Sequence, residues 1–304
     1  MNSTARSIIV VFFVLALGAA GVFIYKDTRR EAEPLPLPID SGETPKPVSI
    51  PDPRHAVIGT SVLGRTIDAY SYGSGKKEIV FVGGIHGGYE WNSVLLAYQF
   101  MDYLSAYPAT IPSSLTLTVI PNANPDGVHA VTGTVGRFSI TDVPTDAKVL
   151  AAGRFNANSV DLNRNFDCKW QPKSVWQSKP VSGGTSAFSE PESAALRDFM
   201  QKHTPAGVVF WHSQAGAVFI SKCEGSILPD TRAMMLAYSK ASGYAGKLSF
   251  DSYTTTGAAD DWLASIGIPA VTVELETHGT IEWSRNLAGI KALLVYFDKP
   301  SSVI

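Results

Sequence analysis

Residues 80–92, with the sequence VFVGGIHGGYEWN, constrain the fold of this chain more than any other stretch. The first three are β-branched or aromatic, as in a buried strand, and a pair of glycines then ends that strand. His86 follows, and after a second pair of glycines Glu90 begins a run with helical periodicity. A histidine and a carboxylate are costly to bury without a partner, and zinc commonly binds both. The stretch therefore predicts part of a zinc site beside a central strand, with a simple turn histidine as the alternative.

Strands and helices alternate through the remainder of the chain. Strands are predicted at 79–82, at 57–72 (two strands joined by a turn at Gly64), and at 115–120, 207–211 and 269–275. Helices are predicted at 92–107, at 189–202 (opened by a capping box of Ser189 and Glu192), and at 231–242 and 284–297. Turn residues predict a loop at 122–127, and residues 128–158 have no clear period. The alternation predicts a three-layer α/β/α fold of the α/β class, with ligand sites beyond strand ends.

The N-terminal segment differs from this pattern. Residues 8–25 form an uncharged apolar run that just reaches the length of a transmembrane helix. We expect residues 1–30 to anchor the protein in a membrane through 8–25, with a cleaved signal peptide as the alternative. Residues 31–53 carry seven prolines and predict a semi-rigid linker to a catalytic domain at 54–304. An anchored enzyme would lie outside the cytoplasm, in the periplasm or at the cell surface, and a cleaved one would be secreted.

Composition and charge exclude several classes of protein. A hydrophobic fraction of 45% with 17% charged residues is typical of a globular chain and not of a disordered one. The formal net charge of −2 provides no basic surface, so we expect no nucleic-acid partner. Cys168 and Cys223 are too few for a disulfide scaffold. The sequence leaves open whether they form one bridge or remain two buried thiols.

A catalytic zinc site uses three protein ligands and keeps one position open. His86 and Glu90 supply two ligands, and His212, at the end of the strand predicted at 207–211, is the natural third. The other histidines are weaker candidates because they lie in predicted loops or in the last turn of a helix; they are His55, His129, His203 and His278.

Two further sites accompany these ligands. Glu274 ends the strand at 269–275 and could take a proton from a zinc-bound water, whereas Glu276 lies two residues further from the apolar core. Arg164 lies in the segment DLNRNFD, residues 161–167, and an arginine can bind a carboxylate through two parallel hydrogen bonds. The alternative is an ion pair between Arg164 and Asp161 or Asp167.

Four motifs occur in the order known from the zinc carboxypeptidases related to carboxypeptidase A. They are NPDG at 124–127, DLNRNFD at 161–167, HSQ at 212–214 and VEL at 273–275. Over residues 55–300 the chain resembles this family, as a bacterial-type, membrane-anchored member. The resemblance implies the family's α/β/α fold with a mixed, mostly parallel central sheet. Carboxypeptidase A is itself the standard example of a catalytic zinc held by two histidines and a glutamate.

The resemblance assigns roles in the reaction. It implies one Zn²⁺ ion held by His86, Glu90 and His212. It implies that Glu274 acts as general base and then as general acid toward the leaving amine. Arg154 resembles the family's arginine that polarises the scissile carbonyl, and such a group typically contributes about 10²–10³ in rate.

Four residues would recognise the substrate. Asn163 and Arg164 would bind its free terminal carboxylate, and Tyr253, in the stretch YTTTGAADDW, matches the tyrosine that closes over that carboxylate. Asp260 matches the residue at the floor of the side-chain pocket. An acid there favours a basic or amine-bearing C-terminal residue.

The chain departs from the family pattern in four places. The spacing from Trp262 to Glu274, which bears on the position of Asp260, is one residue shorter than in the animal enzymes, and Gln214 replaces a tyrosine; the other two departures concern the metal ligands and Arg154.

Three residues separate His86 from Glu90, where the family usually has two. Both can still bind one ion, because positions i and i+4 share a face at the start of a helix. The segment before Arg154 matches less closely, which leaves Arg137 as an alternative.

The implied activity is removal of one C-terminal residue from a peptide with a free carboxylate. Asp260 favours a lysine, arginine or diaminopimelate terminus. A diaminopimelate terminus would make the protein an enzyme that trims cell-wall peptides, a hypothesis that the predicted membrane anchor also favours. One alternative is a zinc-dependent deacylase or amidase of acylated amino acids. The other is a surface binding module that kept the fold and lost turnover.

Overall fold

The structure is a computed structural model that describes residues 53–299. The predicted anchor at 1–30 and the predicted linker at 31–53, apart from its last residue, lie outside the described residues. Of the helices between residues 53 and 299, none has both the length and the apolar character needed to cross a membrane.

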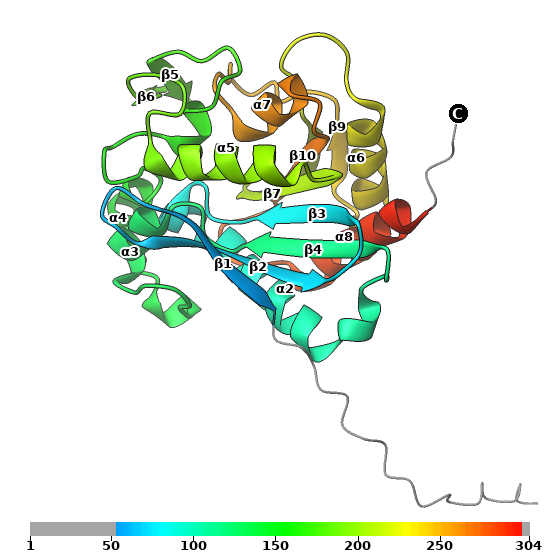
Figure 1. Cartoon of the computed structure of the whole chain (residues 1–304). Coiled ribbons are helices and arrows are strands. Elements are labelled where there is room, and N and C mark those ends of the chain that lie inside the picture. Colours follow the sequence, from blue (N-terminus) through cyan, green and yellow to red (C-terminus); the bar gives the residue numbers. More distant parts are fainter. Residues whose placement is uncertain (1–52, 300–304) are drawn as a thin grey trace, which may run out of the picture. The chain divides into compact units, whose positions relative to one another are not determined.

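A single eight-stranded sheet forms the centre of the domain (Figure 1). In spatial order its strands are β1 (Arg54–Thr60), β2 (Thr66–Gly73), β4 (Leu115–Ile120), β3 (Lys77–Val82), β7 (Gly207–Ser213), β10 (Ala270–Leu275), β8 (Ala217–Ile220) and β9 (Ala245–Lys247). The central strands β4, β3, β7 and β10 run parallel, while β2 and β8 flank them in the antiparallel sense. The predicted mixed, mostly parallel sheet is confirmed.

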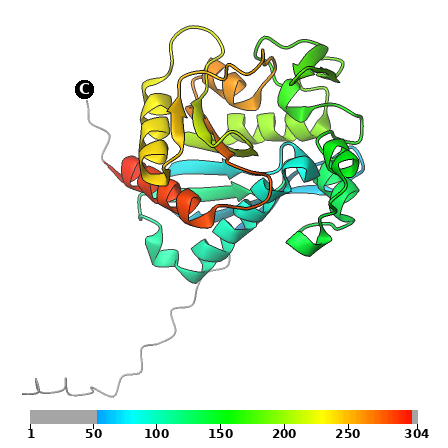
Figure 2. The same cartoon turned by 180° about the vertical axis from the view of Figure 1, so that it is seen from behind.

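Helices cover both faces of the sheet, because the side chains of a buried strand alternate between two apolar cores. Ile79 and Phe81 pack in one core with α2 (Trp91–Ala106), α6 (Pro229–Ser242) and α8 (Trp283–Asp298). Val80 and Val82 pack in the other core with α5 (Pro191–His203) and α7 (Ala259–Ser265). Figure 2 shows α2 and α8 on the side opposite to α5. The three-layer prediction is therefore confirmed.

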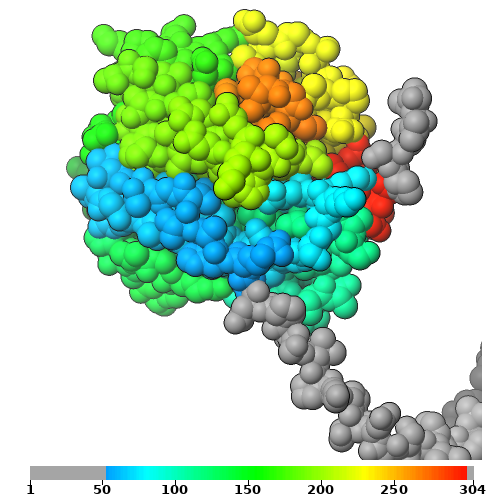
Figure 3. All heavy atoms as spheres, in the orientation of Figure 1, coloured from blue at the N-terminus to red at the C-terminus, as the bar shows by residue number. Residues whose placement is uncertain are grey.

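Helix α5 packs closely against the edge strand β1. A Cβ atom at Gly59 would lie 2.4 Å from the Cβ of Ala195, so only glycine allows this approach. In the space-filling view the blue N-terminal strands lie directly alongside the yellow-green helix (Figure 3). The predicted capping box does not form. Glu190 is the N-cap without a side-chain hydrogen bond, and Ser189 donates to the carboxylate of Glu190 instead.

Helices α3 (Pro125–Thr132) and α4 (Ala147–Ala152) and a small hairpin were not predicted from the sequence. The segment NPDG is not a loop: Asn124 caps helix α3 by accepting from the amide of Gly127. The irregular segment at 128–158 also contains α4. A hairpin of β5 (Lys173–Trp176) and β6 (Lys179–Ser182) lies outside the main sheet.

Cys168 and Cys223 form a disulfide bond, with a Cα–Cα distance of 5.6 Å. Cys168 follows the short 3-10 helix η4 (Leu162–Arg164), and Cys223 follows β8. The bridge therefore joins two loops that are 55 residues apart in sequence. Of the two alternatives left open by the sequence, the structure contains the bridge.

Candidate metal centre and substrate cavity

Three neighbouring parallel strands bring the candidate reactive groups together. His86 follows the carboxyl end of β3, His212 lies near the end of β7, and Glu274 lies near the end of β10. Glu274 is paired with His212 in the β10–β7 ladder. Parallel strands carry their carboxyl ends to one edge of the sheet, which is where such folds place ligands.

A tight turn joins His86 to Glu90. The 3-10 helix η1 (Gly87–Glu90) begins with Gly87 at a φ of +47°. A Cβ atom at Gly87 would lie 2.4 Å from the carbonyl oxygen of Gly153, and one at Gly88 would lie 2.5 Å from the side chain of Val131. The two glycines therefore permit both the backbone conformation and the close packing of the turn. This turn brings His86 and Glu90 together despite the extra residue between them.

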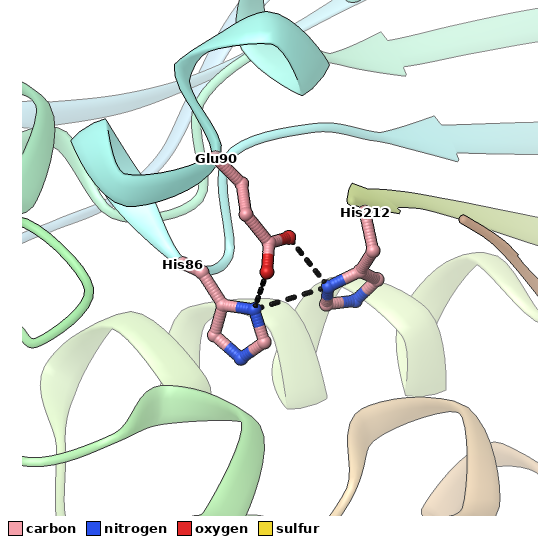
Figure 4. A group of neighbouring side chains, drawn as sticks. All are labelled: His86, Glu90 and His212. Atoms are coloured by element: carbon pink, nitrogen blue, oxygen red, sulfur yellow. Dashed lines mark hydrogen bonds and ion pairs between the residues drawn. The ribbon is translucent and has the colours of Figure 1, made fainter. Parts of the chain in front are cut away.

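The side chains of His86, Glu90 and His212 converge on one point (Figure 4). The Nδ1 atoms of the two histidines are 3.1 Å apart. The carboxylate of Glu90 lies 2.7 Å from His86 Nδ1 through Oε1 and 2.9 Å from His212 Nδ1 through Oε2. All three residues are buried. Two imidazole nitrogens facing each other beside a carboxylate form a donor set that fits a divalent zinc ion, so the residues present fit the metal.

Asp161 lies behind His86. Its carboxylate is 3.4 Å from His86 Nε2, the nitrogen that faces away from the donor cluster. A carboxylate in this position fixes the orientation of a metal-binding imidazole. Burial alone would raise the pKa of Asp161, but the charges of Arg154 and Arg164 hold that pKa well below its usual range.

Arg154 is buried beside the same cluster. Its Nε donates to Asp161 Oδ2 over 2.9 Å, and its Nη1 lies 3.6 Å from Glu90 Oε1. The indole ring of Trp176 packs against the guanidinium group, with 4.6 Å from Cζ to the ring centroid. Arg154 is thus held in place by an acid and an aromatic ring next to the metal ligands.

Glu274 lines a cavity next to the two candidate histidine ligands. Burial and the negative charge of Glu90 raise the pKa of Glu274 to about 8. Its Oε2 atom is buried and has no hydrogen-bond partner within residues 53–299. The position of Glu276 is different, since that side chain is exposed and forms a 2.6 Å ion pair with Arg285.

A cavity of about 330 Å³ opens from these groups. His86, His212 and Glu274 line it. Arg154 and every predicted substrate-binding residue also line the cavity; the latter are Asn163, Arg164, Tyr253 and Asp260. The structure therefore brings all nine predicted site residues into one connected region, since Glu90 contacts both histidines.

Arg164 is buried and carries a positive charge without a carboxylate partner in the described part of the chain. Only 2% of its surface is exposed. It donates to the carbonyl oxygens of Asn163 and Val175 and forms no ion pair with Asp161 or Asp167. The ring of Tyr253 lies 5.9 Å from its Cζ. Asn163 anchors the start of α7 by accepting from the amide of Ala259 over 2.9 Å.

Two adjacent acids on α7 line the cavity. Thr272 donates to Asp260 over 2.9 Å, and the backbone amide of Lys222 donates to Asp261 over 2.8 Å. Burial raises the pKa of Asp260. Burial and the charge of Asp260 together raise the pKa of Asp261 to about 7. Of these two acids, only Asp260 was predicted from the sequence, although the adjacent pair of aspartates in YTTTGAADDW could have indicated both.

The alternative candidates lie outside the site. Arg137 forms a bidentate ion pair with the exposed Asp102, at 2.8 and 3.0 Å, and does not line the cavity. His55 and His203 pair with surface acids, His129 lies in α3, and His278 contacts the hydroxyl of Ser213. Of the two candidate arginines, Arg154 lines the cavity and Arg137 does not.

Comparison with known proteins identifies relatives of this arrangement. A family model described as zinc carboxypeptidase matches residues 50–288. The chain is 28% identical to gamma-D-glutamyl-L-diamino acid endopeptidase 1 of Lysinibacillus sphaericus, over 72% of this chain and 59% of that protein. It is 27% identical to carboxypeptidase B of Bos taurus, over 74% of this chain and 58% of that protein. The chain thus spans about three fifths of the length of these curated relatives.

Solved structures with this fold include a bovine and a bacterial protein. Bovine thrombin-activatable fibrinolysis inhibitor, in complex with tick carboxypeptidase inhibitor, aligns with a TM-score of 0.62 at 21% identity, covering 81% of this chain and 88% of that chain. Murein-tripeptide amidase MpaA from Escherichia coli O157 aligns with a TM-score of 0.58 at 22% identity, covering 84% of this chain and 96% of that chain. At these identities the structural likeness establishes the fold alone.

Proposed function

This chain belongs to the zinc carboxypeptidase family, and we propose that it is a zinc-dependent metallocarboxypeptidase. It hydrolyses the amide bond before a C-terminal residue that carries a free carboxylate. The favoured C-terminal residue has an ammonium group on its side chain, as lysine, arginine and diaminopimelate do. A diaminopimelate terminus would make the protein an enzyme that trims cell-wall peptides.

The main support for this proposal is the environment of Arg164. A buried guanidinium without a carboxylate partner is costly, and here it lines the same cavity as the candidate base Glu274. A free carboxylate on the substrate would supply the missing partner through charge-assisted hydrogen bonds. Tyr253 lies beside Arg164 and could close over the bound group. Such an anchor places the chemistry one residue from the end of the peptide, which is the requirement for an exopeptidase.

His86, Glu90 and His212 would hold the zinc ion. When bound, that ion lowers the pKa of its water toward ~7 and polarises the scissile carbonyl. Glu274 accepts the proton of the attacking water and passes it to the leaving amine. Its side chain lines the same cavity as His86 and His212, which is the position that this role requires. Arg154 donates toward the carbonyl oxygen as negative charge develops there.

The acids Asp260 and Asp261 support a cationic side chain in the pocket. Both line the cavity, and neither has a cationic side chain within ion-pair distance among the described residues. The relative in Lysinibacillus sphaericus is named for a diamino acid, and the structural neighbour from Escherichia coli for a murein tripeptide. These names favour diaminopimelate over lysine or arginine for the bacterial-type chain.

We further propose an extracytoplasmic location, with residues 8–25 as the membrane anchor. The bond between Cys168 and Cys223 supports this location, because disulfides persist outside the reducing cytoplasm. Cell-wall peptides are present on the same side of the membrane.

The test uses the purified full chain loaded with zinc and peptides that differ only in their last residue. The panel includes a wall peptide ending in diaminopimelate, peptides ending in lysine or leucine, amidated copies of each, and an N-acylated amino acid. The products are identified by mass spectrometry. Release of one C-terminal residue, blocked by amidation, would support the proposal. Cleavage of the acylated amino acid alone would indicate a deacylase, and no cleavage with zinc bound would leave a binding module.

A further inference from the structure

Two lysines line the cavity that also contains Asp260 and Asp261. Lys169 follows Cys168 directly, and Lys222 precedes Cys223 directly. Both lysine side chains are exposed, and neither ammonium group has an ion-pair or hydrogen-bond partner within residues 53–299. The disulfide therefore holds two unpaired positive charges at the wall of the substrate cavity.

These lysines and the two acids form one charged cluster. The backbone of Lys222 donates to the carboxylate of Asp261 over 2.8 Å. The charge of Lys169 also acts on Asp261: it opposes the rise in pKa that burial and Asp260 produce. The wall of the pocket thus presents two negative and two positive side chains.

This balance of charge discriminates between side chains. A lysine or arginine side chain presents a single cation, which the acids attract and the lysines repel. A side chain that ends in an amino acid head group presents an ammonium and a carboxylate together. Each of its charges finds a partner of opposite sign in the cluster, and charge-assisted hydrogen bonds are the strong ones.

We propose that Lys169 and Lys222 bind a second carboxylate, located at the end of the substrate's side chain. This inference rests on the proposed function and deepens it: the pocket selects a C-terminal diamino diacid, such as diaminopimelate, over lysine and arginine. Asp260 and Asp261 bind the ammonium of the same head group. The disulfide positions both lysines, since it fixes the backbone next to each of them.

The experiment measures kcat/KM of the zinc-loaded full chain on three peptides of one sequence. They end in diaminopimelate, in diaminopimelate whose side-chain carboxylate is a carboxamide, and in lysine. We expect kcat/KM for the peptide ending in free diaminopimelate to exceed that for each of the other two peptides by about tenfold or more. Each of those two lacks one hydrogen bond between charged groups. The double variant K169Q/K222Q should lose this preference for the diacid and should cleave the lysine peptide at least as fast as the wild type. K240Q removes an exposed lysine outside the cavity and serves as the matched control.

The outcomes separate the two proposals. If the wild type releases residues from all three peptides with equal kcat/KM, or if K169Q/K222Q keeps the preference, the role of the lysines is wrong while the carboxypeptidase function stands. If the wild type cleaves none of the peptides with zinc bound, the proposed function itself is wrong. Circular dichroism spectra of the variants exclude misfolding as the cause of a lost preference.

Discussion

Glu274 and His212 stand opposite each other in the parallel ladder of β10 and β7. The pairing fixes the distance between a candidate base and a candidate metal ligand through two buried strands and no mobile loop. The proposed general base is therefore held by two neighbouring strands in the centre of the sheet. Burial lowers the pKa of His212, but the carboxylate of Glu90 and, to a smaller extent, that of Glu274 raise this pKa above its usual value.

Replacing Glu274 with glutamine should abolish catalysis and preserve the metal centre. We expect kcat to fall by about 10³-fold, within the range typical of a lost general base, because glutamine cannot accept the proton. Zinc content, measured by elemental analysis, should remain at the wild-type level. The matched control is E276Q, since Glu276 lies two residues away, is exposed and pairs with Arg285. Equal losses in both variants would contradict the assignment of Glu274.

Removal of zinc should lower both activity and stability. A ligand that binds only the folded protein, at about 1,000 times its Kd, stabilises it by about 4 kcal/mol, so the metal-free protein should melt earlier. H212A should lower the zinc affinity by more than about 100-fold, since losing a group that merely orients a ligand already costs ~10–100-fold. H203A is the control, because His203 pairs with Glu78 at the surface. A melting temperature of H212A that still rises with zinc as in the wild type would exclude His212 as a ligand.

Replacing Asp161 with asparagine should destabilise the protein. The change removes the closer of the two ion pairs of the buried Arg154 guanidinium and leaves only the longer one to Glu90. Breaking a buried pair typically costs about 3–5 kcal/mol. It also removes the carboxylate behind His86, so zinc affinity should fall by about 10–100-fold. Urea unfolding and zinc titration measure the two effects. D167N removes an exposed acid of the same motif and should change neither.

The central strands, and helices on both faces of the sheet, could be predicted from the sequence. Buried parallel strands are continuous apolar runs, which are easy to recognise. The shorter helices and strands were not predicted. NPDG is composed of turn residues, yet the same residues begin a helix when asparagine caps it and proline takes the first position. Strands β8 and β9 and helix α7 are too short for their periods to be recognised. Their positions depend on packing against elements distant in sequence.

The two candidate histidine ligands could be predicted because each follows a predicted strand, and Glu90 because it begins a helical run four residues after His86. The sequence could not show whether Arg164 forms an ion pair, since Asp161 and Asp167 are both its neighbours in sequence. Only the structure shows that Asp161 pairs with Arg154, whereas Arg164 has no ion pair within residues 53–299. The position of Lys169 and Lys222 at the cavity depends on a bridge between residues 55 apart, and a pair of cysteines alone does not reveal it.

Reduction of the disulfide should destabilise the domain. A bridge that closes a loop of this length contributes up to about 4 kcal/mol in the chain-entropy model, and native bridges typically contribute about 2–4 kcal/mol. Guanidinium unfolding with and without reductant measures the loss. The double variant C168S/C223S should match the reduced wild type and should show no further response to reductant. Equal stability of the oxidised and reduced proteins would contradict a structural role for the bridge.

The preference for cationic side chains should depend on pH. The pKa of Asp261 is raised to about 7 in the free pocket, so this carboxyl is neutral below that pH and attracts an ammonium only above it. The ratio of kcat/KM for a lysine-ended peptide to that for a leucine-ended peptide should therefore fall as the pH drops from 8 to 6. Taking the ratio removes the titration of Glu274, which affects both peptides equally. D261N should give a lower ratio without this pH dependence.

The same titration should appear in the stability of the substrate-free protein. A carboxyl whose pKa is higher in the folded state than in the unfolded state stabilises the fold while it is protonated. The contribution of Asp261 is fully present below its unfolded pKa, near 4, and is lost as the pH rises through about 7. D261N should therefore flatten the decline of the wild-type unfolding free energy between pH 5 and pH 8. A decline of the same slope in D261N would show that Asp261 is already ionised across this range, and the pH dependence of specificity would then need another group.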